Sequence, residues 1–396
     1  MQLTDYQKGI LPKRFHSLDA LRGLAALAVV FSHWKLFFFQ GTEQTQFNRE
    51  RQPLYFLFEP LYTEGWRAVD LFFCLSGFIF FWLYSEKIQR RETLLKEFFV
   101  LRFSRLYPLH FLTLLLVVAG QQIMLWRYGS FFVVAHNDLY HFGLQTVFAS
   151  NWGFEAGYSF NAPIWSVSVE ILCYALFFPI CVLNCHRWWQ LALYICGGYF
   201  LMRIDLPEVG RGVFSFFIGG LSFQIFGCVL RRSPPRIALQ FLGWVAGLLW
   251  ILIPLNLHHN LLHRIYKTCF WNESFNFHGK DIGGAILLNL TLFSYELVLY
   301  PLTVVTLALW ETQRGTLAKR LAVLGDISYS SYLLHFPLQL LFAGVVLTSS
   351  AQVSFFYSPW ALLLFFLVLI PLSLCCYKYF ERPSQSLIRA LALRRS

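Results

Sequence analysis

The sequence contains little charge for its length. Lys, Arg, Asp and Glu make up 13% of the 396 residues, whereas a soluble domain typically carries about 25%. Hydrophobic residues make up 57%, with 43 Phe and 13 Trp, and the mean hydropathy is +0.52. These values exclude an ordinary soluble domain and predict a surface that mostly faces lipid. The net charge of +11 is then explained by the basic loops of a membrane protein, and no nucleic-acid partner is expected.

Motifs for metal binding and for disulfide bonding are also missing. The nine Cys show no CxxC or Cys/His zinc spacing and lie mostly inside apolar runs, so they are expected to be small core residues. Candidate metal ligands look scattered, without His/carboxylate spacing, and no metal is expected. Polar residues precede Leu18, and the first apolar run is too long for the core of a signal peptide. A single integral-membrane domain over residues 1–396, without an appended soluble domain, is therefore expected.

Long apolar runs are present instead. A membrane helix needs about 20 mostly apolar residues. Ten candidate segments cover residues 20–39, 68–84, 105–126, 164–185, 188–202, 213–230, 237–256, 284–310, 326–348 and 358–380. The fifth is short, and the eighth is interrupted by Glu296 and Pro301. Residues 139–150 are apolar but too short for a span, which favours an interfacial or re-entrant helix. The sequence thus predicts an all-α, polytopic bundle of about ten transmembrane helices.

The basic residues predict the orientation of this bundle. With ten spans both termini lie on the same side, and most of the 32 Lys and Arg residues fall in the loops and tails of that side. The loop at 85–105 is short and rich in basic residues, as cytoplasmic loops usually are. Both termini are therefore predicted to be cytoplasmic.

The first apolar run, LDALRGLAALAVVFSHW over Leu18–Trp34, carries ionisable residues at regular spacing. At about 100° and 1.5 Å per residue, Arg22 and His33 point within about 20° of each other, roughly 16 Å apart. Asp19 precedes Arg22 by one turn and can pair with it. An interfacial arginine and a histidine bonded to a backbone carbonyl are the structural alternative. The aligned trio favours a polar stripe that runs into the membrane, because ionisable residues within spans usually face a bundle interior or a water-filled path.

Two further segments carry charged residues at the ends of predicted spans. RFSRLYPLH places Arg102 and Arg105 one turn apart at the inner end of the third span, where two guanidinium groups can hold phosphates. Anchoring of the helix by the positive-inside rule is the alternative. VDLFFCLSGFIFF contains Asp70 near its start, and its Ser76-Gly77 pair is a small-residue spot that another helix or a substrate can approach.

The segment NAPIWSVSVEILCYALF brings a carboxylate into an apolar span. After Trp165, it places Ser166 and Glu170 one turn apart, with Tyr174 a further turn along. A glutamate inside a membrane helix is costly, so a functional role is favoured over a structural one.

A second polar stripe is predicted near the C-terminus. ISYSSYLLHFP stacks Ser328, Tyr332 and His335 at positions i, i+4 and i+7, so that this stripe also ends in a histidine. Packing of the hydroxyl groups between helices is the structural alternative.

These motifs together resemble a known family. The order RFHSLDALRGLAALAVVFSH, VDLFFCLSGF, RFSRLYPLH, APIWSVSVE, ISYSSYLLHFP and FERP, over about residues 14–384, is similar to acyltransferase family 3 of membrane-bound O-acyltransferases. The family's Arg-x10-His element matches Arg22 and His33, and its Arg-x-x-Arg element matches Arg102 and Arg105. The resemblance implies about ten spans and transfer of an acyl group, often acetyl, from a cytoplasmic thioester such as acetyl-CoA. Some members carry a fused extracytoplasmic esterase-like domain, which is not expected here.

The resemblance and the chemistry of acyl transfer suggest roles for these residues. His33 is expected to act as the base, or to be acylated transiently. Asp19 would hold Arg22, and Glu170 would orient the histidine or the acceptor. The phosphates of acyl-CoA would be held by Arg22, Arg102 and Arg105. The other candidates for acceptor-binding or structural roles are Asp70, Ser76, Trp165, Ser166, Tyr174, Tyr332 and His335.

The expected partners are the lipid bilayer of the plasma (inner) membrane, acyl-CoA, and a glycan, lipid or exported metabolite that offers a hydroxyl. A secondary transporter is the main alternative, because intramembrane Asp, Arg, Glu and His also form ion pathways. No two-fold pattern of broken helices supports it. A receptor or scaffold without catalytic activity would not need ionisable residues aligned through the bilayer.

Overall fold

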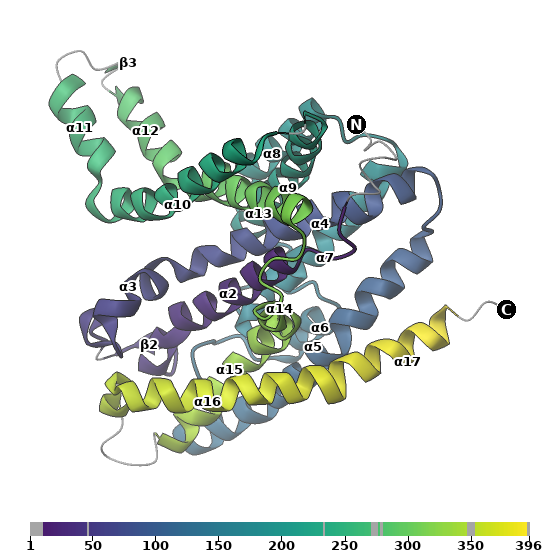
Figure 1. The fold of residues 1–396 in the computed structure, drawn as a ribbon. Helices are drawn as coiled ribbons and strands as arrows, with labels where there is room; N and C mark the ends of the chain where they lie inside the picture. The colour runs from purple at the N-terminus through teal and green to yellow at the C-terminus, as the bar shows by residue number, and fades with distance from the viewer. Residues whose placement is uncertain are drawn as a thin grey trace.

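The computed structural model describes residues 11–45, 47–232, 234–270, 276–277, 280–346 and 353–393, and most of these residues are helical (Figure 1). The strands are two short antiparallel pairs. β1 (Phe39–Gln40) pairs with β2 (Glu43–Gln44), and β3 (Asn276–Phe277) pairs with β4 (Lys280–Asp281). Helices satisfy their own backbone hydrogen bonds, as a chain in lipid requires. The predicted all-α class is confirmed.

The helices follow the apolar runs of the sequence. The first half of the chain contains α2 (His16–Ser32), η1 (His33–Phe38), η2 (Arg49–Arg51), α3 (Tyr55–Glu64), η3 (Gly65–Arg67), α4 (Ala68–Gln89), α5 (Leu95–Tyr128), α6 (Leu139–Thr146), η4 (Ala162–Ile164), α7 (Trp165–Val182) and α8 (Trp188–Leu201). The second half contains α9 (Pro207–Arg231), α10 (Arg236–His259), α11 (Leu261–Phe270), α12 (Ile282–Leu292), η6 (Tyr295–Leu299), α13 (Tyr300–Arg314), α14 (Ala322–Asp326), α15 (Ser328–Val346), η7 (Val353–Tyr357), α16 (Pro359–Cys376), η8 (Tyr377–Glu381) and α17 (Arg382–Ala392).

Seven helical runs of the described residues are long and apolar enough to cross a membrane. They are His16–Phe38, Tyr55–Gln89, Leu95–Tyr128, Ala162–Val182, Pro207–Arg231, Arg236–His259 and Pro359–Ala392. An eighth is obtained if Gly283–Leu292 and Tyr295–Arg314 form one span; this pair is bent by 56°, close to the predicted interruption at Glu296. A polytopic membrane protein is confirmed, whereas length and composition do not support ten separate spans among the described residues.

Three segments account for most of the difference from the predicted spans. α8 has 14 residues, about 21 Å of helix, which is shorter than the roughly 30 Å hydrocarbon core. α15 has 19 described residues, and the end of its predicted span lies outside the described residues. α5 begins at Leu95 and has 34 residues, so it takes up much of the predicted 85–105 loop. The cytoplasmic location of the termini stays a prediction.

Close contact between α4 and α9 forms the centre of the bundle. A Cβ atom added to Gly77 would lie 1.9 Å from the carbonyl oxygen of Phe216, and one added to Gly219 would lie 2.0 Å from that of Cys74. Only glycine lets two helix backbones approach this closely. The predicted small-residue spot at Gly77 is therefore a helix–helix contact.

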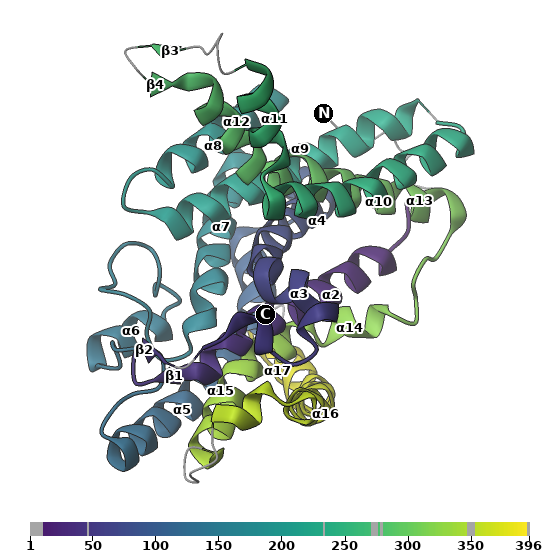
Figure 2. The same ribbon diagram turned by 90° about the vertical axis from the view of Figure 1, so that its left-hand side faces the viewer.

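The helices α2, α7, α8 and α13 pack against this centre, and α15 contacts α2, α5 and α16. α16 and α17 continue as one rod along one edge of the bundle, and α11 and α12 extend from the opposite edge (Figures 1 and 2). The polar residues predicted on α2, α4, α5, α7 and α15 therefore come from helices that pack around a shared interior.

Candidate functional site

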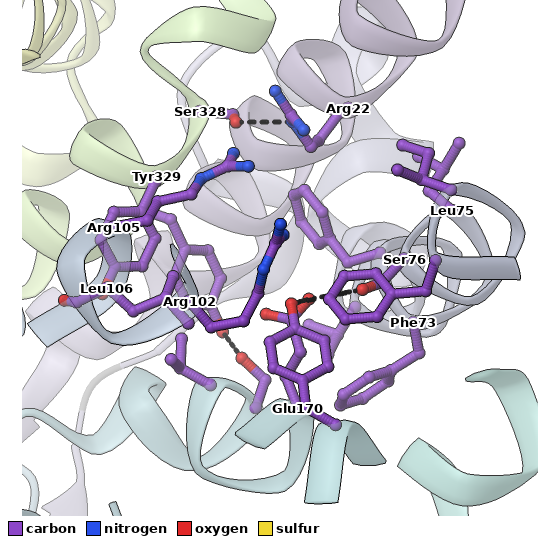
Figure 3. A pocket seen from close by; sticks show the side chains of 18 residues that line it. Arg22, Phe73, Leu75, Ser76, Arg102, Arg105, Leu106, Glu170, Ser328 and Tyr329 are labelled. Carbon is purple, nitrogen blue, oxygen red and sulfur yellow. Dashed lines mark hydrogen bonds between the residues drawn. The ribbon is translucent and has the colours of Figure 1, made fainter. Parts of the chain in front are cut away.

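A cavity between α2, α4, α5, α7 and α15 collects most of the predicted site residues. Figure 3 shows the side chains that line it. The predicted residues among them are Arg22, Ser76, Arg102, Arg105, Ser166, Glu170, Tyr174 and Tyr332. Apolar side chains such as Phe72, Phe73 and Ile79 complete the wall. Residues predicted on five separate helices therefore line one cavity.

Three guanidinium groups point into this cavity (Figure 3). Arg22 donates from Nη2 to the carbonyl oxygen of Gly325 at 2.8 Å and from Nε to the Ser328 hydroxyl at 3.1 Å. Arg102 donates to the Tyr84 hydroxyl, and its Nε is buried without a partner among the described residues. The structure shows no hydrogen bond from Arg105 to another described side chain or backbone group. Arg102 and Arg105 thus keep donors available for a ligand.

Asp19 supports Arg22 from behind, as the sequence predicts. Its Oδ1 lies 3.0 Å from Nη2 of Arg22, and its Oδ2 accepts a hydrogen bond from Arg14. Arg14 in turn pairs with Asp326 at 2.6 Å. Asp19 is almost fully buried and does not line the cavity, so it contacts Arg22 and not the cavity itself.

Glu170 is the carboxylate of the cavity. Its Oε1 accepts hydrogen bonds from the Ser76 hydroxyl at 2.7 Å and from the Tyr174 hydroxyl. The structure does not bring Glu170 to His33, so its expected role in orienting that histidine is not supported. With three guanidinium groups and one carboxylate in its wall, the cavity carries an excess of positive charge.

His33 lies three turns beyond Arg22, outside the cavity wall, and contacts His335. Nδ1 of His33 is 2.8 Å from Nε2 of His335. The two polar stripes, which the sequence presents as separate, therefore face each other: Arg22 contacts Ser328 at one end, and the two histidines meet at the other. The contacts run in the same chain direction on the span His16–Phe38, formed by α2 and η1, and on α15, as expected if both cross the membrane in the same sense.

Tyr332 connects the cavity to the histidine pair. Its hydroxyl donates to the carbonyl oxygen of Pro163 at 2.9 Å and accepts from the Ser166 hydroxyl at 2.7 Å. Its ring lines the cavity, and its backbone carbonyl accepts a hydrogen bond from His335. The site is thus continuous from Arg22 to His33 along one face of α15.

Asp70 and Trp165 belong to a different cluster. Both oxygens of Asp70 accept hydrogen bonds from Arg211, from Nη2 at 2.7 Å and from Nε at 3.2 Å. The guanidinium of Arg211 also lies 4.9 Å from the ring centroid of Trp66 and 5.1 Å from that of Trp165. Neither Asp70 nor Trp165 lines the cavity, so a structural ion pair explains them better than acceptor binding.

Comparison with known proteins agrees with the motifs. Residues 15–378 match the family model described as "Acyltransferase domain". The chain belongs to this family. It is 34% identical over 176 residues to the acyltransferase MdmB of Streptomyces mycarofaciens, covering 42% of the chain and 39% of that protein.

Two other relatives match a larger and a smaller part of the chain. A putative O-acetyltransferase of Staphylococcus aureus strain COL is 23% identical over 351 residues, covering 81% of the chain and 50% of that protein. Protein 2 in the picA locus of Rhizobium radiobacter is 37% identical over 108 residues, covering 27% of the chain and 46% of that protein. The chain spans at most about half the length of these relatives. No solved structure matches it.

The candidate metal ligands are not all scattered, as the sequence led us to expect: three of them lie close together near the start of α6. His136, Asp138 and His141 bring ligand atoms within 4.8 Å of one another. Asp138 caps α6, and His141 is held through both ring nitrogens, by Asp138 at 2.8 Å and by the Ala156 N–H at 3.2 Å. Hydrogen bonds from the backbone and ring of His141 lower the pKa of Asp138. These contacts explain the cluster without a metal ion: Asp138 caps α6, and His141 connects α6 to the loop that contains Ala156.

Two residues that contact predicted site residues were missed by the reasoning from sequence. Gln339, one turn after His335, donates to the backbone carbonyl of His33 at 2.9 Å. A single amide in an apolar helix, on the face of the second stripe, is a signal that could have found it. Arg211 follows the short Pro207–Gly210 segment at the edge of an apolar run, where it reads as an ordinary interfacial cation.

Proposed function

We propose that this protein transfers an acyl group, in the simplest case acetyl, from acyl-CoA at the cytoplasmic side to a hydroxyl of a cell-envelope glycan, lipid or exported metabolite. The excess positive charge of the cavity carries this proposal. Arg22, Arg102 and Arg105 suit an anionic donor, because guanidinium groups bind phosphates through charge-assisted hydrogen bonds. CoA brings several phosphates and a long arm that ends in the thioester. Names of relatives that include "O-acetyltransferase" agree with this reaction class.

The proposed step uses His33 as a base. Nε2 of His33 accepts the proton of the acceptor hydroxyl while the hydroxyl oxygen attacks the thioester carbonyl carbon. The tetrahedral oxyanion then collapses, the C–S bond breaks, and the CoA thiolate leaves and recovers the proton from His33. The products are an ester and free CoA. Transient acylation of His33, followed by transfer to the hydroxyl, is the second route through the same residue.

Secondary transport is less well supported. Transporters built on inverted repeats place broken helices at corresponding positions of the two halves. Among the described residues only one bent helix pair, Gly283–Leu292 with Tyr295–Arg314, passes the length and hydropathy test for a span. The polar residues that run from Arg22 to His33 also end at a histidine pair and not at two matched half-helices.

Binding of CoA tests the donor site. The Arg102→Ala/Arg105→Ala double variant, purified in nanodiscs, should bind CoA at least about tenfold more weakly by calorimetry, since hydrogen bonds to charged groups contribute about 1.5–3 kcal/mol each. Arg314→Ala is the matched control, because Arg314 is an exposed cation of α13 whose guanidinium stacks on Trp310 away from the cavity. Equal CoA affinity in the double variant and the wild type would contradict the proposal.

Transfer itself is tested in membrane vesicles. Acetyl-CoA labelled in the acetyl group is added to inverted vesicles, and the label is followed into alkali-labile esters of the envelope fraction. We expect esters to form only in vesicles that contain the protein. Accumulation of free labelled solute without ester would favour transport.

A further inference from the structure

His33 and His335 meet edge to edge, in the plane of their rings. A ring nitrogen lies about 1.1 Å from the centre of an imidazole, so two rings joined by an in-plane hydrogen bond of about 2.8 Å have centroids about 5 Å apart. The observed nitrogen distance is 2.8 Å, the centroid separation is 5.0 Å and the angle between the rings is 21°. These values describe a well-aligned hydrogen bond and not face-to-face stacking.

The second nitrogen of His335 determines the direction of this bond. His335 is fully buried, and its Nδ1 lies against the backbone carbonyl oxygen of Tyr332. A carbonyl oxygen only accepts hydrogen bonds, so Nδ1 of His335 carries the hydrogen. In a neutral imidazole the other nitrogen is then an acceptor. Nε2 of His335 therefore accepts, and Nδ1 of His33 donates.

This order leaves Nε2 of His33 without a hydrogen. The structure shows no hydrogen bond to this nitrogen from any described residue, so its lone pair is available. No carboxylate of the described residues forms an ion pair with either ring. Lys35, two residues after His33, is itself a cation and cannot offset a positive charge on the pair. A protonated pair would place an uncompensated cation in a buried environment, which is costly. Both rings are therefore neutral in this arrangement.

We infer that His335 is a positioning residue for His33. Through the chain Tyr332 carbonyl, His335, His33, it holds His33 in the tautomer with hydrogen on Nδ1 and presents the Nε2 lone pair to the acceptor hydroxyl. The chemical meaning of this inference rests on the proposed function, whereas the tautomer itself does not. Gln339 completes the arrangement by holding the backbone carbonyl of His33. In serine proteases an aspartate fixes the tautomer of the catalytic histidine; here a neutral histidine anchored on the backbone would do so.

Nitrogen-15 NMR tests the tautomer without reference to activity. The protein is labelled at histidine nitrogens in nanodiscs, and the two signals are assigned by their loss in His33→Gln and His335→Gln. We expect Nδ1 to be protonated and Nε2 unprotonated in both residues. A hydrogen on Nε2 of His33 overturns the inference, even if acyl transfer is demonstrated. The expected tautomer in a protein that fails to transfer acyl groups would instead refute only the proposed function.

Two substitutions of His335 test its effect on the reaction. The side-chain oxygen of glutamine reaches the place of Nε2 and can accept from His33, whereas that of asparagine reaches only the place of Nδ1. We expect His335→Gln to keep kcat within about tenfold of the wild type and His335→Asn to lose at least about a hundredfold, as expected when a base is mispositioned. The affinity for CoA should stay unchanged in both, because neither histidine lines the cavity.

Several outcomes would overturn the role of His335. Equal losses of kcat in the two variants would show that position 335 needs histidine for another reason, and equal retention would show that it positions nothing. A loss expressed only in the KM for the donor would assign His335 to binding. If His335→Asn does not fold, the kcat of His335→Gln and the tautomer measured in the wild type decide the question.

Discussion

Replacement of His33 by glutamine separates donor binding from chemistry. Glutamine keeps a polar side chain of similar reach but has no basic nitrogen. A positioned base contributes about 10² to 10⁴ in rate, which corresponds to about 2.7–5.5 kcal/mol of activation free energy. His33 does not line the cavity with the three arginines, so CoA affinity should not change. We therefore expect His33→Gln to bind CoA normally and to lose at least about a hundredfold in transfer.

The effect on stability should be small by comparison. The substitution changes one hydrogen bond to His335, and hydrogen bonds between membrane helices contribute on average about 0.6 kcal/mol. His335→Gln cannot be the control, because His335 contacts His33 directly. His110→Gln is better matched: His110 is a fully buried histidine of α5 that is bonded to the backbone carbonyl of Gln145 at 2.8 Å.

The assay compares initial rates of acetyl ester formation in vesicles with CoA affinity in nanodiscs for the wild type and both variants. His110→Gln should keep its transfer rate within about threefold, well below the loss of about a hundredfold expected for removal of a base. Near-wild-type transfer by His33→Gln would refute the assignment of the base. A comparable loss in both variants would show that the loss is not specific to His33 and would likewise refute its assignment as the base.

Three further predictions concern the fold. Gly77→Ala should lower the thermal midpoint, with a loss of about 1–3 kcal/mol or more from overpacking, because its Cβ would lie 1.9 Å from a backbone oxygen. Gly247→Ala is the control and should leave the midpoint unchanged, because its Cβ would meet nothing within 4 Å. Equal midpoints in the two variants would contradict the prediction. Asp70→Asn should destabilise the protein by about 3–5 kcal/mol by leaving the Arg211 cation unpaired. Adding Arg211→Met to this variant removes the unpaired cation, and recovery of the thermal midpoint in the double variant would support this explanation. Reporter fusions at the C-terminus and in the loop 257–283 should report opposite sides of the membrane, and the same side would refute the predicted topology.

Apolar runs predicted most helices because a membrane span needs a continuous hydrophobic surface. Their ends were predicted less well. α5 begins at Leu95, although charged residues in its first turns suggested a loop, because lysine and arginine tolerate helix well and can reach past the lipid. The length of α8 cannot be read from hydropathy alone, since a short apolar helix is also stable when it packs against a long one such as α9.

Residues that share a helix were brought together as periodicity predicts, and residues on different helices were not predictable as pairs. Ser166, Glu170 and Tyr174 share one face of α7, and Asp19 pairs with Arg22. The contact of His33 with His335 joins helices separated by 302 residues, and no local pattern carries that information. The same reason explains why Arg211 was missed as the partner of Asp70, 141 residues earlier.

The long separation between the two polar stripes has a consequence for biogenesis. The ribosome completes α2 and the start of η1, with Asp19, Arg22 and His33, about 300 residues before α15 emerges. At about 5–20 residues per second, this interval lasts roughly 15–60 s. Throughout it, the first helix must remain in or near the membrane without the hydroxyls and histidine that later pair with it. Until α15 is made, the unpaired polar groups of this helix are exposed to the insertion machinery and to membrane proteases. Substitutions in α15 that prevent the pairing should therefore reduce the amount of protein that matures, by leaving the first helix unpaired.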